Sequence, residues 1–163
     1  MNRRSLFPRL APLLLAAFLL AGCATTGGRV DPQTGPWSGR LSLRVDSEPP
    51  QSFSAAFELA GDAGRGELRL FSPFGSTLAE LRWQPADAVL LQGGGERHFE
   101  SVDRLLEQAT GAPLSAQALF DWLRGQSAEV AGWQADLSQW RQGRLSARRQ
   151  TPPAAELRLV LDR

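Results

Sequence analysis

Residues 37–45 read WSGRLSLRV, and apolar and polar side chains alternate along this stretch. Successive side chains of a strand point to opposite faces, so Trp37, Leu41 and Leu43 fall on one face while serine and arginine side chains fall on the other. A strand with one buried and one solvated face is typical of an antiparallel sheet. We therefore expect a folded domain with such a sheet to begin at Trp37.

The same alternation recurs further along the chain. The runs that carry it are residues 53–59, 68–72, 77–83, and the pair 89–92 and 97–100. The turn residues that separate them are Pro49-Pro50, Gly61 to Gly64, Pro73 to Gly75, and Gly93-Gly94-Gly95. The runs follow one another at about ten-residue spacing, which indicates an antiparallel meander.

A helical period replaces the alternation after residue 100. Apolar side chains recur three and four positions apart over residues 102–109, with Ser101 as the expected N-cap and Gly111 as the expected C-terminal stop. A second helix is expected to begin at Ser115 and to end at Gly125. The residues predicted on its apolar face are Leu119, Trp122 and Leu123.

The last third of the chain returns to strands. Residues 133–140 fit either a helix or a loop, because tryptophans and a leucine have helical spacing but glycines flank the segment. Alternation over residues 145–147 and 157–161 predicts two closing strands around Pro152-Pro153. Strands, two short helices and further strands predict one α+β domain over residues 37–163.

The predicted sheet is broad compared with the helices that would cover it. About seven or eight amphipathic strands would form a curved sheet, and two short helices are too small to fill its concave side. The sheet either closes on its own side chains or keeps an apolar cavity under the helices. The periodicity leaves both arrangements open.

The N-terminal residues have the organisation of a lipoprotein signal peptide. A basic start with Arg3 and Arg4 precedes an apolar run over residues 10–20 that is too short to span a bilayer. The following Leu20-Ala21-Gly22-Cys23 resembles the bacterial lipobox, in which the cysteine receives a diacylglyceryl group before cleavage. We therefore expect residues 1–22 to be removed and Cys23 to bear the lipid.

Residues 23–36 are expected to connect this anchor to the domain. They are polar and rich in Gly and Pro, which is typical of a flexible tether. Cys23 is the only cysteine, so an internal disulfide is excluded and lipidation accounts for the thiol. Ala24 follows it, whereas an aspartate there typically retains lipoproteins in the inner membrane. We therefore expect a lipid anchor in the outer membrane, on its periplasmic face.

The charges of the chain give no reason to expect a nucleic-acid partner. The 18 basic residues are all arginine, and Arg3, Arg4 and Arg9 lie in the predicted signal peptide, whereas all 17 acidic residues follow it. The remaining chain is slightly acidic, and proteins that bind nucleic acid usually carry a basic patch.

No motif in the sequence indicates catalysis, a metal site or a cofactor. His98 is the only histidine, and the Gly-x-Ser-x-Gly motif of serine hydrolases does not occur. Metal ligands do not recur at the usual spacing, and Gly93-Gly94-Gly95 lacks the lysine of a phosphate-binding loop. We expect a protein that is not an enzyme and needs no cofactor; a lipoprotein hydrolase that uses His98 is the rival interpretation.

Residues 70–81, LFSPFGSTLAEL, place a large apolar residue at the tip of a predicted turn. Phe74 lies between Pro73 and Gly75, where turns normally carry polar side chains. Phe74 either folds back into the core or projects into solvent, and the sequence fits both arrangements.

This turn resembles the Pro-Leu-Gly-Ser-Thr loop of the LolB family, outer-membrane lipoproteins that receive other lipoproteins from the periplasmic carrier LolA. Phe74 stands where the family usually has leucine. Further similar segments, in the same order as in the family, are Trp37-Ser38-Gly39-Arg40, the pair Phe53 and Phe57, Gly111-Ala112-Pro113-Leu114, Trp122-Leu123-Arg124-Gly125, and residues 157–161. The resemblance covers nearly all of the chain after the tether.

The resemblance implies a fold and a site. The fold is a curved antiparallel half-barrel sheet with short helices as a lid over an apolar cavity for acyl chains. Pro73, Phe74 and Gly75 would form a loop that inserts into the membrane. The side chains expected around the cavity are Leu41, Leu43, Phe57, Leu70, Leu81, Trp83, Leu105, Leu119 and Trp122.

The resemblance also implies a function and its partners. The chain would accept triacylated lipoproteins from LolA, shelter their acyl chains and insert them into the outer membrane. Its partners would be LolA, this cargo and outer-membrane lipids, and we expect it to act as a monomer. The alternative is a structural outer-membrane lipoprotein with a packed barrel and no ligand.

Overall fold

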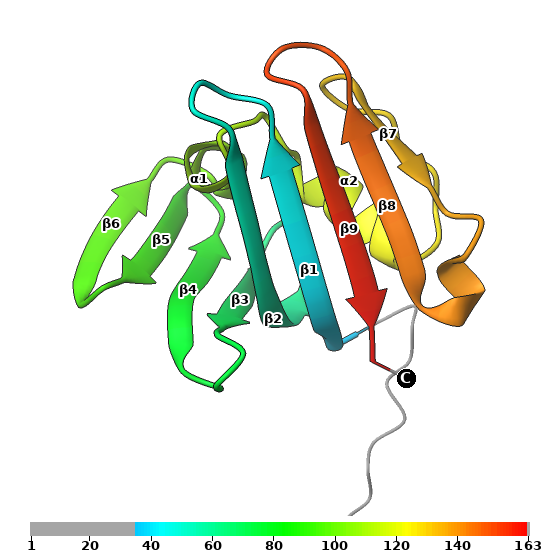
Figure 1. The fold of residues 1–163 in the computed structure, drawn as a ribbon. Helices are drawn as coiled ribbons and strands as arrows, with labels where there is room; N and C mark the ends of the chain where they lie inside the picture. The colour runs from blue at the N-terminus through cyan, green and yellow to red at the C-terminus, as the bar shows by residue number, and fades with distance from the viewer. Residues whose placement is uncertain (1–34, 163) are drawn as a thin grey trace, which may run out of the picture.

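The computed structural model describes residues 35–162, which form one antiparallel sheet with two α-helices on one of its faces (Figure 1). The strands are β1 (Trp37–Val45), β2 (Gln51–Gly61), β3 (Gly66–Phe71), β4 (Thr77–Gln84), β5 (Asp87–Gln92), β6 (Gly95–Phe99), β7 (Trp133–Asp136), β8 (Arg144–Arg149) and β9 (Ala155–Leu161). The helical segments are α1 (Val102–Thr110), α2 (Ala116–Leu123) and the 3₁₀ turn η1 (Trp140–Gln142). The expected signal peptide 1–22, the lipidated Cys23 and most of the tether 23–36 lie outside the described residues.

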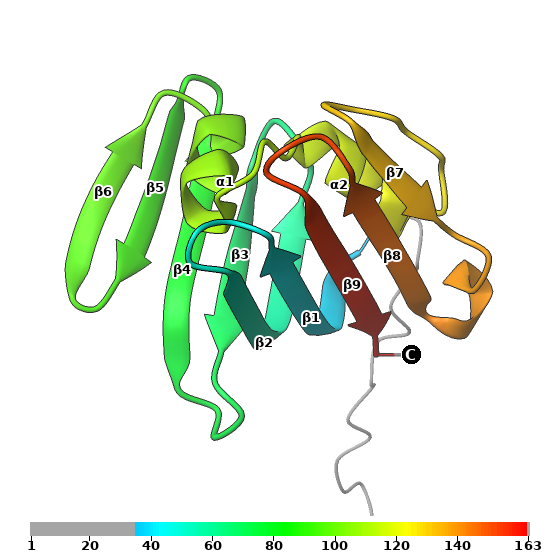
Figure 2. The ribbon, with the colours of Figure 1, turned by 45° about the horizontal axis from the view of Figure 1, so that its top comes forward.

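The first strand lies in the interior of the sheet. Within residues 35–162 the strand order is β6-β5-β4-β3-β2-β1-β9-β8-β7. Leu41 of β1 lies opposite Ala55 of β2 on one side and opposite Leu159 of β9 on the other. Strand β1 thereby joins the predicted meander to the closing strands, and the sheet curves around the side that carries the helices (Figures 1 and 2). The predicted α+β half-barrel is confirmed.

Both helices begin and end where the sequence predicts, within a residue or two. At α1 the backbone N–H of Arg104 donates to Ser101 Oγ at 3.2 Å, and Gly111 ends the helix in the left-handed conformation. Ser115 precedes α2 but makes no side-chain capping bond. Instead, Asp103 of α1 accepts from the N–H of Ala116 at 2.8 Å, so one helix caps the other.

Aromatic side chains attach α2 to the sheet. Phe120, which is 1% exposed, lies between Trp37 and Trp83, with ring centroids 5.6 Å and 6.2 Å apart. On the other side of α2, Trp122 packs against Trp133 of β7 at 6.4 Å, and its indole N–H donates to Ala128 O at 2.9 Å. These contacts fix the position of α2 under the central and closing strands.

Residues 133–140, which fit either a helix or a loop, begin with a strand instead. Trp133–Asp136 form the edge strand β7, which pairs with β8 so that Trp133 lies opposite Arg149 and Asp136 opposite Ser146. The 3₁₀ turn η1 then begins at Trp140. Trp140 is nevertheless used in packing, because its indole N–H donates to Leu123 O at 2.9 Å. The helical spacing of the tryptophans therefore reflects two separate contacts with α2. Among residues 35–162 there is no helix with the length and apolarity needed to cross a membrane.

Gly39 of β1 lies too close to β9 for any residue with a side chain. Its φ is +155°, and a Cβ at this position would be 2.0 Å from the carbonyl oxygen of Val160 and 2.9 Å from Cα of Leu161. The obstacle is the backbone of the paired strand, so β1 and β9 would have to separate to admit even a methyl group.

We expect Gly39→Ala to lower the free energy of unfolding by about 2 kcal/mol or more, because it adds backbone strain and disturbs the central strand pair. Thermal denaturation followed by circular dichroism measures the effect. Gly95→Ala is the matched control, because the nearest atom to its added Cβ, Gln92 O, is 3.6 Å away. Equal melting temperatures for the two variants would contradict the prediction.

Candidate functional site

The concave face of the sheet encloses an apolar cavity of about 420 Å³. Its walls come from side chains of β1 to β6 and β9 and from both helices. The apolar residues that line it are Leu41, Leu43, Phe53, Phe57, Leu59, Leu68, Leu70, Leu78, Ala79, Leu81, Leu90, Leu106, Ala109, Leu114, Leu119, Leu123, Leu157 and Leu159. The volume lies within the range of about 300–1,000 Å³ that is typical of small-molecule pockets.

The structure brings most of the predicted cavity residues to this lining. These are Leu41, Leu43, Phe57, Leu70, Leu81 and Leu119. Trp83, Leu105 and Trp122 lie elsewhere: each is buried in the core and none is part of the lining. Trp83 and Trp122 are used in the aromatic contacts of α2. On the helices, the next residues along, Leu106 and Leu123, face the cavity instead.

Sequence reasoning missed several lining residues that strand register could have found. Leu157 and Leu159 lie directly opposite Leu43 and Leu41, so they share the face of those two residues. Leu68 lies opposite Leu81 in the same way. No comparable signal in the sequence marks the polar residues of the lining, which are Gln51, Ser52, Gln92, Arg97, Gln108 and Thr110.

The turn between β3 and β4 carries the most exposed large apolar side chain in the described part of the chain. Phe74 is 95% exposed, so it projects into solvent and does not fold back into the core. The turn extends beyond the ends of the neighbouring strands, at the bottom of Figure 2. A large apolar side chain held in water at the tip of a projecting turn suits contact with another apolar surface.

Ser72 holds this turn in shape. Its Oγ accepts from the N–H groups of Phe74 and Ser76, both at 3.2 Å. Its backbone N–H donates to Ser76 O at 2.8 Å, and its carbonyl accepts from the N–H of Gly75 at 2.9 Å. Gly75 has a φ of +82°, which favours glycine. Four hydrogen bonds to one residue therefore fix the direction in which Phe74 points.

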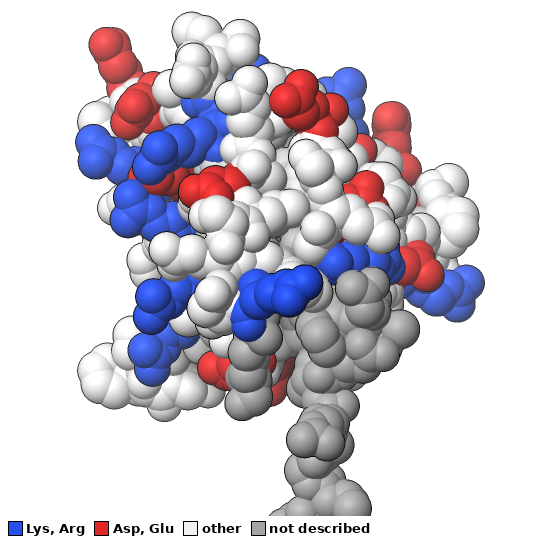
Figure 3. All heavy atoms as spheres, turned by 90° about the vertical axis from the view of Figure 1, so that its right-hand side faces the viewer, with Lys and Arg blue, Asp and Glu red and all other residues white. Residues whose placement is uncertain are grey.

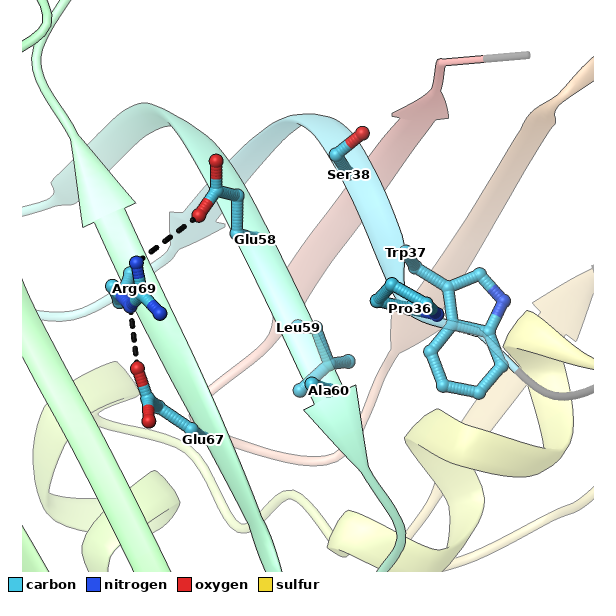
Figure 4. A pocket seen from close by; sticks show the side chains of 8 residues that line it. All are labelled: Pro36, Trp37, Ser38, Glu58, Leu59, Ala60, Glu67 and Arg69. Atoms are coloured by element: carbon cyan, nitrogen blue, oxygen red, sulfur yellow. Dashed lines mark hydrogen bonds and ion pairs between the residues drawn. The ribbon is translucent and has the colours of Figure 1, made fainter. Parts of the chain in front are cut away.

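A second hollow of about 440 Å³ lies on the outer face of the sheet (Figure 4). Arg69 pairs there with Glu67 and, at 3.5 Å, with Glu58. The ring of Trp37 points away from these side chains, toward the helices. The carboxylate and guanidinium side chains at this hollow pair with one another, and their partial exposure makes each pair weak. The outer hollow therefore combines apolar residues (Pro36, Trp37, Leu59 and Ala60) with a charged cluster, whereas leucines dominate the lining of the inner cavity.

His98 is an exposed residue of β6 with two acidic neighbours. Its ring nitrogens lie 2.9 Å from Glu96 Oε1 and 3.5 Å from Asp87 Oδ1. Hydrogen bonds to Asp87 and Glu96 raise the pKa of His98 above its ordinary value. Within residues 35–162 no group of three or more His, Cys, Asp and Glu side chains could hold a metal ion. These contacts make His98 part of a surface ion-pair cluster.

The molecular surface beside β7 carries charges of both signs. On that side, shown in Figure 3, arginines and acidic residues are interspersed and separated by uncharged surface. In strands β8 and β9, Glu156 pairs with Arg148 at 2.9 Å and with Arg158 at 3.0 Å. This face therefore presents no continuous patch of one sign.

An open curved sheet, two short helices over its concave face and a leucine-lined cavity define a half-barrel protein with an apolar internal site. A family model described as Outer membrane lipoprotein LolB matches residues 36–160. The chain belongs to this family, and membership supports a lipid-anchored location in the outer membrane.

Related proteins from other bacteria align with most of the chain. The outer-membrane lipoprotein LolB of Bordetella petrii is 31% identical over 150 residues, which cover 75% of this chain and 74% of that protein. The one from Halorhodospira halophila is 29% identical over 167 residues, or 82% and 81% of the two chains. The one from Bordetella parapertussis is 36% identical over 122 residues, or 69% and 59%.

We expect Ser72→Ala to loosen the β3–β4 turn without unfolding the sheet, because it removes two side-chain hydrogen bonds at an exposed site, worth about 1 kcal/mol each at most. Amide hydrogen exchange at Phe74 and Ser76 should become several-fold faster. Ser54→Ala, at an exposed position of β2, is the control. Unchanged exchange at both amides would contradict a role for Ser72 in fixing the turn.

Proposed function

We propose that this chain accepts triacylated lipoproteins from the periplasmic carrier LolA, shelters their acyl chains in the concave cavity and inserts them into the outer membrane. The observation that carries the proposal is the combination of an apolar cavity with Phe74, 95% exposed on a braced turn. A structural lipoprotein with a packed barrel would need neither feature.

The cavity would keep the acyl chains of a lipoprotein out of water while the lipoprotein moves to the membrane. Each exposed methylene costs about 0.8 kcal/mol, so three acyl chains cannot cross the periplasm uncovered. Transfer between two apolar cavities keeps the chains covered throughout. The direction of transfer then follows from differences in affinity, with the carrier binding most weakly and the bilayer most strongly.

Phe74 supplies contact with the bilayer in this proposal. An aromatic ring partitions favourably into the interfacial region of a membrane, as the usual leucine of the family would also do as an apolar residue. Ser72 keeps the ring pointing outward, so little conformational entropy is lost when it enters the membrane. With Cys23 acylated, the anchor would hold the domain close to the surface that Phe74 enters.

We expect Phe74→Glu to leave cargo binding within about twofold of the parent but to reduce transfer into vesicles by about tenfold or more, because an ionised carboxylate is strongly disfavoured in an apolar environment. Transfer of a fluorescently labelled lipoprotein from its carrier to vesicles of outer-membrane lipid measures both steps. Phe74→Leu should keep transfer.

Val160→Glu is the matched control for this experiment. Val160 is also an exposed apolar residue, at 49%, but its neighbour Leu159 faces the cavity, so Val160 faces the opposite side of the sheet. Normal transfer by Phe74→Glu, or an equal loss with Val160→Glu, would refute the role of Phe74.

We expect Leu70→Asp to weaken binding of a fluorescent acyl probe by about tenfold or more, because it adds a charge to the half-buried cavity wall. Probe fluorescence on titration with protein measures the affinity. Val89→Asp is the control, because Val89 is also half-buried but faces the outer side of the sheet, opposite His98. Equal affinities for the two folded variants would favour a packed barrel without a ligand.

A further inference from the structure

Arg97 is the one charged residue among those that line the apolar cavity. The other polar lining residues are neutral amides and hydroxyls: Gln51, Ser52, Gln92, Gln108 and Thr110. Arg97 is exposed and lies on the edge strand β6, so its guanidinium meets both water and the mouth of the cavity.

Strand register fixes the face to which Arg97 belongs. Arg97 lies directly opposite Leu90, which is 3% exposed and also lines the cavity. Side chains directly opposite each other in an antiparallel pair share a face. Arg97 therefore belongs to the concave face, although its neighbours His98 and Glu96 belong to the outer one.

The acidic residues near Arg97 in the sheet pair with another residue. Glu96 and Asp87 both contact the ring of His98 on the outer face. Within the described residues, no carboxylate oxygen lies within ion-pair distance of the Arg97 guanidinium, and no hydrogen bond from it to another residue is present. Arg97 thus offers a planar set of N–H donors beside a leucine-lined space.

We propose that the cavity also binds a single-chain lipid with an oxyanion head, its acyl chain among the leucines and its carboxylate or phosphate on Arg97. A guanidinium binds both kinds of oxyanion through paired hydrogen bonds. The cavity volume of about 420 Å³ lies in the range of small-molecule pockets, so a single-chain lipid fits the cavity as the structure has it. The inference rests on the proposed function only in that the same cavity holds an acyl chain.

This ligand differs in charge from the proposed cargo. The triacylated cysteine of a lipoprotein presents ester and amide carbonyls, which are neutral. An anionic single-chain lipid would therefore compete with the cargo for the cavity but would depend on Arg97 to a greater degree. It would cover the apolar lining when no cargo is bound.

The test compares decanoate, decyl phosphate and decanol as competitors of a neutral apolar probe, N-phenylnaphthylamine. The protein tested is residues 24–163, which contain the whole described domain (35–162) but neither Cys23 nor the apolar run 10–20, so that neither an acyl chain nor an uncleaved signal peptide competes for the cavity. We expect both anions to bind about tenfold more tightly than decanol, with a preference that decreases as salt is added. Arg97→Gln should remove this preference and leave decanol binding unchanged.

Arg40→Gln is the matched control, because Arg40 is an exposed arginine of β1 beside Leu41 but on the outer face. Arg97→Lys should retain part of the preference for the anions, since it keeps the charge but not the paired donors.

The outcomes of this test are distinct. A preference for only one anion would identify the head group as a carboxylate or a phosphate and would support the proposal. Equal binding of all three competitors by the parent, or a preference that survives Arg97→Gln, would overturn it while leaving the acyl cavity in place. Failure of decanol and both anions to displace the probe would overturn this proposal and the acyl cavity together.

Discussion

The concave face of the sheet is much wider than the helices that cover it, and this mismatch determines where the cavity lies. Nine strands at a spacing of about 4.8 Å make a sheet about 38 Å wide from the first strand to the last before curvature. Helices of nine and eight residues are each about 13 Å long and about 10 Å across. Helix α2 lies under the central and closing strands and α1 near β5 and β6, so the apolar surface between them keeps an open space.

The molecule separates the side chains that fix its fold from those that surround its cavity. Tryptophan and phenylalanine dominate the first group, in which Phe120, Trp122 and Trp133 are each 1% exposed or less. Indole N–H groups donate to backbone carbonyls and so hold the positions of α2 and the segments after it. Leucines dominate the second group. Flexible aliphatic side chains around a space adapt to a bound chain, while the aromatic contacts beside them hold the helices in place.

Alternation in the sequence was sufficient to predict the strands of the meander, because one face of each strand is buried and the other is solvated. It was not sufficient for β7, which has only four residues and lies between Gly132 and Gly143. Alternation left open whether the concave face holds a cavity or a packed core, but it does group the side chains that share a face. Strand parity placed Leu41 and Leu43 correctly on the concave face, but helical spacing could not distinguish Leu105 from Leu106. Which of these two neighbours faces the cavity depends on the rotation of α1 against β5, and tertiary packing decides that rotation.

The exposure of Phe74 was undecided in the sequence for a different reason. A turn that reads Ser-Pro-Phe-Gly can direct its aromatic ring either way, and the difference arises from Ser72, whose hydroxyl binds two N–H groups of the turn. A serine in this position has many other uses, so its role is evident only from the hydrogen bonds.

The energy available from Phe74 also constrains how the proposed insertion would work. Transfer of one phenylalanine side chain out of water stabilises a complex by about 1.5–3 kcal/mol, which is too little to hold a free domain on a membrane. With the domain tethered through the lipid proposed on Cys23, the same energy would act at a high effective concentration and would suffice for repeated, short-lived entry. A stronger apolar patch would instead keep the domain on the bilayer and its cavity away from an incoming carrier. A single exposed ring on a braced turn therefore fits a protein that must alternate between a soluble partner and the membrane.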